Sequence, residues 1–228
     1  MSLKKPLNFY YIMKTKLVSL LLALGLTSNA AFSGNSAKIG YASDFFYRGA
    51  QKSEEAVQAS VRLASELAGL NVSAHACTNQ AIDSATDSYN LGAGLGKSFS
   101  DGLISVYGGI NHFEDVPGNA LSEVEVGISS NVLLNPRVSA FRDFDDSLYT
   151  LELGVSHSFD LSVADLNLDA SYGNTELTNS VDRNYYSVGA EVSKSVSENA
   201  DLAVGVDYVD SDDIDREFVF GAGLTFKF

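Results

Sequence analysis

The last twelve residues, Glu217-Phe218-Val219-Phe220-Gly221-Ala222-Gly223-Leu224-Thr225-Phe226-Lys227-Phe228, alternate strictly between two kinds of side chain. Every second residue from Phe218 to Phe228 is apolar, and four of these six side chains are phenylalanines. The residues between them are small, β-branched or polar. A period of two predicts a β-strand with one apolar face. Soluble proteins rarely expose so long an apolar row, but a strand of a transmembrane β-barrel presents one to lipid.

Eleven further segments alternate in a similar way and are separated by turn-forming residues. The expected strands are 38–48, 55–67, 70–79, 88–97, 103–113, 122–131, 137–143, 148–158, 165–173, 185–194 and 201–209. Most have about the 9–11 residues that cross a bilayer as a tilted strand. With the final segment they make twelve, an even number, as in bacterial single-chain barrels. The sequence thus predicts an all-β fold, a transmembrane antiparallel up-and-down β-barrel of about 12 strands. A secreted soluble β-sandwich is the alternative fold.

Composition narrows the possible functions. The chain has 228 residues with a formal net charge of -14, which argues against nucleic-acid binding. It has one cysteine, Cys77, which excludes an internal disulfide framework. We expect no cofactor.

The N-terminal segment resembles a signal peptide. Lys14 and Lys16 precede an apolar core at 17–26, and Ser28-Asn29-Ala30 supplies small residues for cleavage. A second methionine, Met13, is a possible true start. We therefore expect residues 1–30 to be a signal peptide and residues 31–228 to form the barrel, located in the bacterial outer membrane.

Aromatic residues support this assignment. If the N-terminus of the barrel lies in the periplasm, tyrosines on the apolar face gather at the ends of odd strands and the starts of even ones. This places them at the outer interface, where barrels carry an aromatic girdle. The predicted girdle consists of Tyr47, Tyr89, Tyr149, Tyr172, Tyr186, Tyr208 and Phe218.

The opposite face of the strands is predicted to line the lumen and carries more acid than base. Its predicted charged residues are Lys38, Asp44, Arg48, Arg62, Glu123, Glu125, Arg137, Glu152, Asp169, Glu191, Asp207 and Lys227. Two interpretations remain open: an internal network of ion pairs that closes the lumen, or a narrow water-filled path that favours cations. A barrel of about twelve strands has a bore between the filled eight-strand and the open sixteen-strand classes.

No catalytic or metal site is predicted. The three histidines, His75, His112 and His157, are scattered, and no G-x-S-x-G motif is present. The acidic run 210–215 lacks the glycine and the ligand spacing of a helix-loop-helix calcium site. We expect it to be a solvated outer loop and the protein not to be an enzyme.

Three segments resemble a known family. Ser43-Asp44-Phe45-Phe46-Tyr47-Arg48-Gly49 resembles the S-D-Y-x-x-R-G opening of the proteobacterial Gcw-type conserved hypothetical family, and residues 135–145 and 151–159 are similar to its middle hairpin. That family is thought to consist of outer-membrane barrels. The resemblance therefore implies the same fold and location, and it implies no substrate.

The sequence predicts a narrow, porin-like channel for passive diffusion of small solutes, with a preference for cations. A non-conducting surface barrel with an adhesive or structural role in its acidic loops is the alternative. The expected partners are outer-membrane lipid and lipopolysaccharide, and the barrel assembly machinery. The latter would bind the terminal Phe226 and Phe228, because a strand ending in this way is similar to the assembly signal of outer-membrane barrels.

Overall fold

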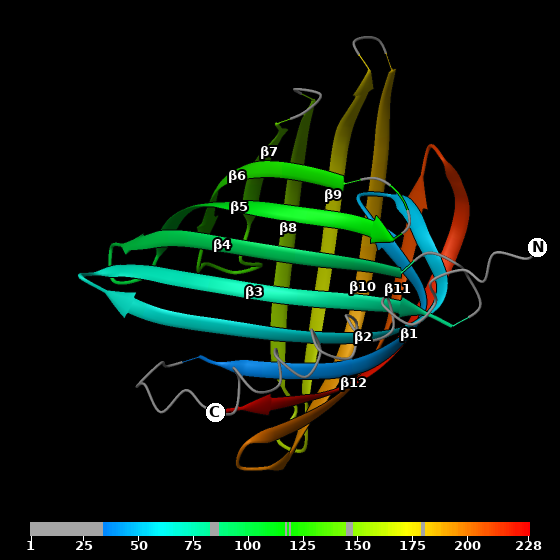
Figure 1. The fold of residues 1–228 in the computed structure, drawn as a ribbon. Coiled ribbons are helices and arrows are strands. Elements are labelled where there is room, and N and C mark those ends of the chain that lie inside the picture. Colours follow the sequence, from blue (N-terminus) through cyan, green and yellow to red (C-terminus); the bar gives the residue numbers. More distant parts are fainter. Residues whose placement is uncertain (1–33, 83–86, 117, 119, 145–147, 179–180) are drawn as a thin grey trace, which may run out of the picture.

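Twelve antiparallel strands close into one barrel in the computed structural model (Figure 1). It describes residues 34–82, 87–116, 118, 120–144, 148–178 and 181–228. The predicted signal peptide lies outside the described residues. Each strand pairs with its neighbours in the chain, and β1 closes the ring by pairing with β12. The predicted fold class is confirmed.

The strands are longer than the alternation alone indicated. They are β1 Ser36–Tyr47, β2 Ala50–Leu67, β3 Leu70–Ala81, β4 Asp87–Phe99, β5 Ile104–Val116, β6 Ala120–Ser130, β7 Arg137–Asp143, β8 Tyr149–Asp160, β9 Asp165–Thr178, β10 Val181–Ser197, β11 Ala200–Ser211 and β12 Ile214–Lys227. Polar residues around 174–184, between the expected strands 165–173 and 185–194, indicate an outer loop, as does the acidic run at 210–216, but both segments are largely strand. The interpretation as loops was wrong because polar residues also occur where strands continue beyond an apolar belt.

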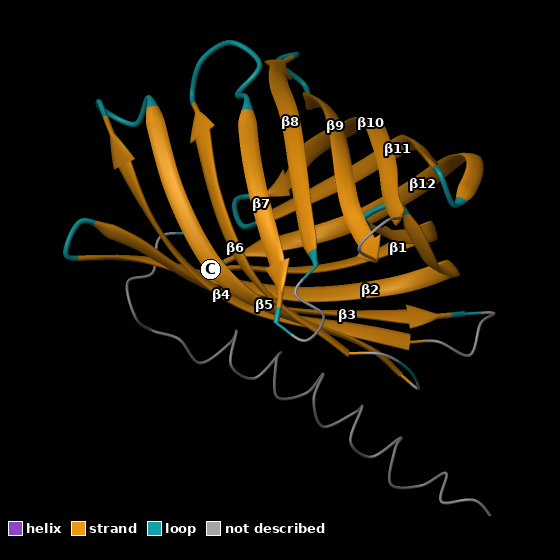
Figure 2. Ribbon diagram, turned by 90° about the horizontal axis from the view of Figure 1, so that it is seen from above, coloured by secondary structure: helices purple, strands orange, loops and turns teal. Residues whose placement is uncertain are grey.

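One end of the barrel holds the start of β1 and the end of β12, and we call the opposite end the distal end. The two turns that lie there at 48–49 and 212–213 join their strands with two residues each. Seen from above, β8–β10 and β2–β4 form opposite walls (Figure 2). No helix in the described part of the chain is long and apolar enough to cross a membrane.

The outer surface of the barrel is apolar and the inner surface is polar. Ile110, Val126 and Phe220 point outward with 57%, 57% and 59% of their surface exposed. In water this belt would be costly, at about 25 cal/mol for each Å² of apolar surface. In a bilayer it is the expected lipid-facing surface.

Interior glycines make room for large neighbours. The ring of Tyr185 on β10 lies over Gly173 of β9, and its hydroxyl donates to Glu152 of β8 at 3.1 Å. In the same way the ring of Tyr107 lies over Gly127 and its hydroxyl reaches Ser139, two strands away, at 2.6 Å. Such tyrosines tie together strands that are not adjacent.

This packing predicts that Gly173→Ala destabilises the barrel by about 1–3 kcal/mol, the usual cost of overpacking. A Cβ at Gly173 would lie 2.1 Å from the Tyr185 ring, which would have to leave Glu152. Gly221→Ala is the matched control, because a Cβ there meets nothing nearer than 3.6 Å. Urea unfolding in lipid vesicles measures both, and equal stability of the two variants would contradict the prediction.

Candidate functional site

The polar interior of the barrel is the candidate site. The structure places all twelve charged residues predicted for the lumen on the inner side of their strands. Some of them form ion pairs across neighbouring strands: Arg137 with Glu152 at 3.6 Å, and Lys227 with Asp201 near the termini. The predicted ion-pair network is therefore present, but it covers only part of the wall.

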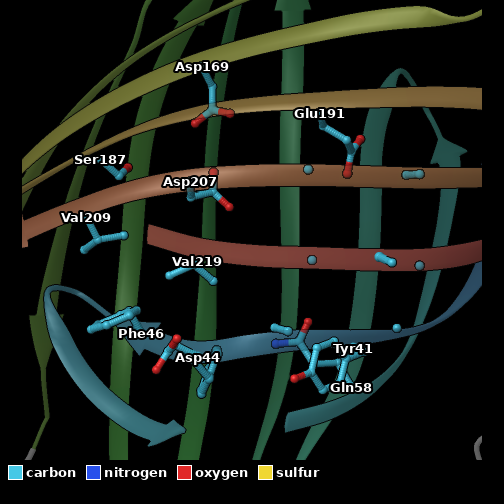
Figure 3. Close-up of a pocket in the computed structure, with 18 of the residues that line it drawn as sticks. Tyr41, Asp44, Phe46, Gln58, Asp169, Ser187, Glu191, Asp207, Val209 and Val219 are labelled. Atoms are coloured by element: carbon cyan, nitrogen blue, oxygen red, sulfur yellow. The ribbon is translucent and has the colours of Figure 1, made fainter. Parts of the chain in front are cut away.

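Three acidic side chains occupy one wall without such a partner. Asp169 on β9 and Asp207 on β11 both pair in register with Gly189 of β10, and their carboxylates extend over that glycine. Glu191 follows two residues along β10, and the three carboxylates extend into the same space (Figure 3). None of the ion pairs among the described residues includes any of the three. We call Asp169, Glu191 and Asp207 the acidic wall.

The acidic wall faces a cavity of about 560 Å³. Lys38 and Gln58 line the cavity from β1 and β2, and Asp44 and Arg48 of the first hairpin line it as well, so two bases stand beside four acids there. A second cavity, of about 670 Å³, lies against β2–β6 and is lined by Arg62 and Glu125. The interior of the barrel therefore holds space for water and small solutes.

The tip of the first hairpin, residues 44–54, leaves the barrel wall. In-register pairing of β1 with β12 ends at Ala42, and pairing of β2 with β3 begins only at Ala56. Where β1 departs, Ser43 Oγ accepts a hydrogen bond from the backbone N–H of Phe220 at 3.0 Å. An extra residue, Lys52, disrupts the register of β2 against β1, and such bulges bend a hairpin. The tip therefore has no neighbouring strand along either edge and folds into the lumen.

Arg48, at the turn of this hairpin, crosses the lumen. Its guanidinium lies 2.5 Å from a carboxylate oxygen of Glu123 on β6, and 3.9 Å from the ring centroid of Phe141 on β7. β6 lies five strands from β1 in one direction around the ring and seven in the other. Glu123 is 1% exposed, so the bore is filled at this level.

Other residues of the tip contact both sides of the interior. The Tyr47 ring stacks on Phe113 of β5 with centroids 4.7 Å apart, and Lys52 Nζ lies 3.0 Å from Asp115 of the same strand. On the opposite side, the carbonyl of Gly49 accepts a hydrogen bond from Ser211 of β11 at 2.7 Å. The tip thus spans the bore from β5 to β11.

The placement of Tyr47 corrects one prediction. It was expected in the outer aromatic girdle, but its hydroxyl donates to Glu123 inside the lumen at 3.2 Å. The reason is the inward fold of the hairpin. One face of β1 points outward at Ile39. Because the hairpin bends inward, the same face contacts the inner side of β5 at Tyr47.

The other predicted girdle residues lie on the outer surface toward the distal end. Tyr186 pairs in register with Tyr172, and Tyr208 pairs with Phe218, so these four form a continuous aromatic row over β9–β12. Tyr149 on β8 and Tyr89 on β4 point outward beyond this row.

The acidic run near the β11–β12 turn contacts the neighbouring β9–β10 hairpin. Asp213 forms an ion pair with Arg183 of β10, and Asp210 accepts hydrogen bonds from Tyr186 and Tyr208. Asp212 accepts hydrogen bonds from the backbone and the side chain of Asn184, which lower the pKa of its carboxyl group. Asp212 and Asp213 are exposed at the turn, as expected for a solvated segment, and the neighbouring hairpin also engages them.

One serine–histidine pair occurs on the outer surface. Nδ1 of His112 lies 2.8 Å from Ser122 Oγ, and Nε2 lies 3.6 Å from Glu114. Serine hydrolases bind the nucleophile through Nε2 and the acid through Nδ1, the reverse of this arrangement. Ser122 also lines neither of the two interior cavities described above. Among the described residues, no group of three His, Cys, Asp or Glu side chains could hold a metal ion.

Sequence reasoning missed several interior residues, among them Lys52, Asp115, Tyr185 and Asp201. Asp115 lies two residues beyond the predicted end of its strand, on the same face as Phe113, and Asp201 begins the face of β11 that carries Asp207. Tyr185 precedes Tyr186, so the alternation that turns Tyr186 outward turns Tyr185 inward. Only Lys52, at the irregularity in β2, had no signal in the pattern.

Comparison with solved structures gives the same architecture. The chain is similar to the KdgM porin, with a TM-score of 0.58 and 14% sequence identity over 85% of this chain and 99% of the porin. It is similar to the COG4313 outer membrane channel from Pseudomonas putida F1, with a TM-score of 0.58 and 9% identity over 85% of this chain and 95% of that channel. The fold is that of a bacterial outer-membrane β-barrel.

An outer-membrane enzyme has a fold similar to that of these two channels. The calcium-bound dimer of outer membrane phospholipase from Salmonella typhi aligns with a TM-score of 0.54 and 13% identity, over 91% of this chain and 97% of that one. Barrel shape therefore does not distinguish a channel from an enzyme, and the function must be argued from the interior. No family model and no curated protein matches the sequence.

Proposed function

We propose that the protein is a narrow outer-membrane channel for passive diffusion of small solutes, with a preference for cations. The acidic wall is the observation that carries the proposal. Three carboxylates face a cavity inside a closed barrel, and no ion pair among the described residues neutralises them. Rings and walls of acid in a pore select cations through the local potential.

The pairing of the remaining charges supports this sign of selectivity. Arg48, Arg137 and Lys227 each have an acidic partner, so they do not offset the acidic wall. Of the two bases that line the cavity, Lys38 is the one that forms no ion pair among the described residues. A low-dielectric wall focuses the resulting negative potential into the lumen.

The test is the reversal potential in a salt gradient across a planar bilayer. We expect cation selectivity in the wild type, and loss of most of it in the triple variant Asp169→Asn, Glu191→Gln, Asp207→Asn. The preference should fade as salt rises, because the Debye length is about 10 Å at 0.1 M and shorter above it.

Asp212→Asn with Asp213→Asn is the matched control, since these acids lie at the β11–β12 turn outside the cavity. We expect it to change selectivity little. A wild-type reversal potential of anion sign, or a triple variant as cation-selective as the wild type, would refute the proposal.

The alternative function, a non-conducting surface barrel acting through acidic loops, has less support. Its main candidate, the acidic run at the β11–β12 turn, is engaged by Arg183, Asn184 and two tyrosines. These internal contacts reduce the acid available to an external ligand.

We further propose that the distal end faces the cell exterior and that the aromatic row on β9–β12 lies at the outer-leaflet interface, in contact with lipid and lipopolysaccharide. Aromatic belts occupy this level in outer-membrane barrels. The resemblance of 43–49 to the Gcw-type family is consistent with the same location.

A further inference from the structure

The distal half of the lumen is filled by the tip of the first hairpin rather than by water. Three interior residues that face it on β5, β6 and β10 are almost fully buried: Phe113 at 3%, Glu123 at 1% and Tyr185 at 6% exposure. In an open bore, side chains on the inner wall would be in contact with water. The first cavity ends at Arg48 and Gly49 of the tip, with Tyr185 beside them.

We propose that the tip of the first hairpin, residues 44–54, is the constriction of the channel, and that the Arg48–Glu123 ion pair across the lumen determines which solutes pass. This inference rests on the proposed channel function and names the element that limits it. The ion pair is the contact best placed for this role, because it joins the turn of the hairpin to the far wall.

Three features indicate that the tip can be displaced while the barrel remains closed. The tip has no in-register strand neighbour on either edge, so moving it breaks no rung of the β1–β12 or β2–β3 ladders. It touches the wall at a few points, among them Phe113, Asp115, Glu123, Phe141, Thr150 and Ser211. The ladder from Ser36 to Ala42 holds the barrel closed below it.

The ion pair also explains why the tip would rest inside. Arg48 and Glu123 satisfy each other where both are shielded from water, and Phe141 and Tyr47 lie beside the guanidinium. A buried carboxylate that loses its cation is strongly unfavourable. Pairing with Arg48 removes this penalty while the tip is docked, and the ion pair with Glu123 and the contact with the Phe141 ring hold the turn against the far wall.

The test combines solute passage with a labelling assay that does not depend on conduction. Glu123→Arg places two cations face to face and should displace the tip. We expect the conductance in planar bilayers to rise at least threefold, with a larger size limit for neutral sugars in liposome swelling. Arg48→Glu combined with Glu123→Arg restores opposite charges, and we expect it to recover much of the wild-type limit.

Asp201→Lys is the control, because it sets like charges against Lys227 on the neighbouring strand at the other end of the lumen. We expect it to leave the size limit unchanged. Heat-modifiable migration on gels verifies that every variant is folded.

The labelling assay uses Ser187→Cys in a Cys77→Ala background. Ser187 lines the first cavity (Figure 3) and follows Tyr185 by two residues on β10. A bulky, membrane-impermeant maleimide added to intact cells should label it slowly, and at least tenfold faster when Glu123→Arg is added.

The possible outcomes distinguish failure of the proposed constriction from failure of the proposed channel function. Unchanged labelling rate and size limit in folded Glu123→Arg would overturn the constriction and leave the channel in place. Faster labelling without current in any variant would support the displaceable tip and refute the channel.

Discussion

Phe228→Ser should remove most of the folded protein from the outer membrane, whereas Leu153→Ser should leave a much larger folded fraction. Phe228 directly follows β12 and continues its series of outward phenylalanines, which is similar to the assembly signal of outer-membrane barrels. Leu153 lies in the middle of the outer face of β8. The measurement is the amount of heat-modifiable, membrane-integrated protein after equal expression.

The comparison is informative because stability alone predicts no such difference. The two side chains are almost equally exposed on the barrel, Phe228 at 44% and Leu153 at 45%. Loss of either apolar side chain costs about 1.5–3 kcal/mol by burial arguments. Only recognition during assembly would make the terminal residue much more sensitive.

A second measurement isolates that recognition. Both variants should refold in detergent or lipid to barrels of similar urea stability, since the assembly machinery is absent there. Equal folded amounts of the two variants in cells would contradict a role for Phe228 in assembly.

The alternation of side chains was sufficient to predict the barrel wall. Side chains on a strand point to opposite faces whatever the strand packs against. For this reason the inner placement of residues such as Asp169 and Asp207, and the outer placement of Tyr172 and Tyr208, agree with the pattern.

The first hairpin could not be predicted in this way. The face that carries Ile39 and Tyr41 also carries Phe45 and Tyr47, and this pattern carries no information on whether the strand still has neighbours. The tip folds inward because its pairing with β12 and β3 ends, which depends on how far those strands extend in space. The cross-lumen pair of Arg48 and Glu123 is a tertiary contact between residues 75 positions apart.

The acidic run shows a related limit. A cluster of aspartates between two strands is typical of a solvated loop, and composition favoured that interpretation. The structure places Asp212 and Asp213 in an exposed two-residue turn, and it adds contacts with the β9–β10 hairpin that the composition did not indicate. Their partners, Asn184 and Arg183, lie in the next strand pair and could be identified only from the register of β10 against β11.

Arg48→Met alone should cost about 3–5 kcal/mol of stability, the usual price of stranding one partner of a buried ion pair. Glu123 would keep only the hydrogen bond from Tyr47, and its second carboxylate oxygen already has no partner among the described residues. The double variant Arg48→Met, Glu123→Met should recover most of that loss, because replacing both charges by apolar side chains is often near neutral. Urea unfolding in lipid vesicles gives the three free energies of the cycle.

The loss of stability in Arg48→Met also shows whether the tip of the hairpin stays docked in the lumen. If the tip leaves the lumen in Arg48→Met, Glu123 regains contact with water and its penalty disappears. The measured loss then cannot exceed the free energy with which the tip docks in the lumen. A loss close to the full range would mean that the tip stays docked over an unpaired carboxylate, and a smaller loss with fast labelling of Ser187→Cys would mean that it is released. If Arg48→Met and the double variant both had wild-type stability and slow labelling, this result would contradict a buried, mutually dependent pair at this level of the bore.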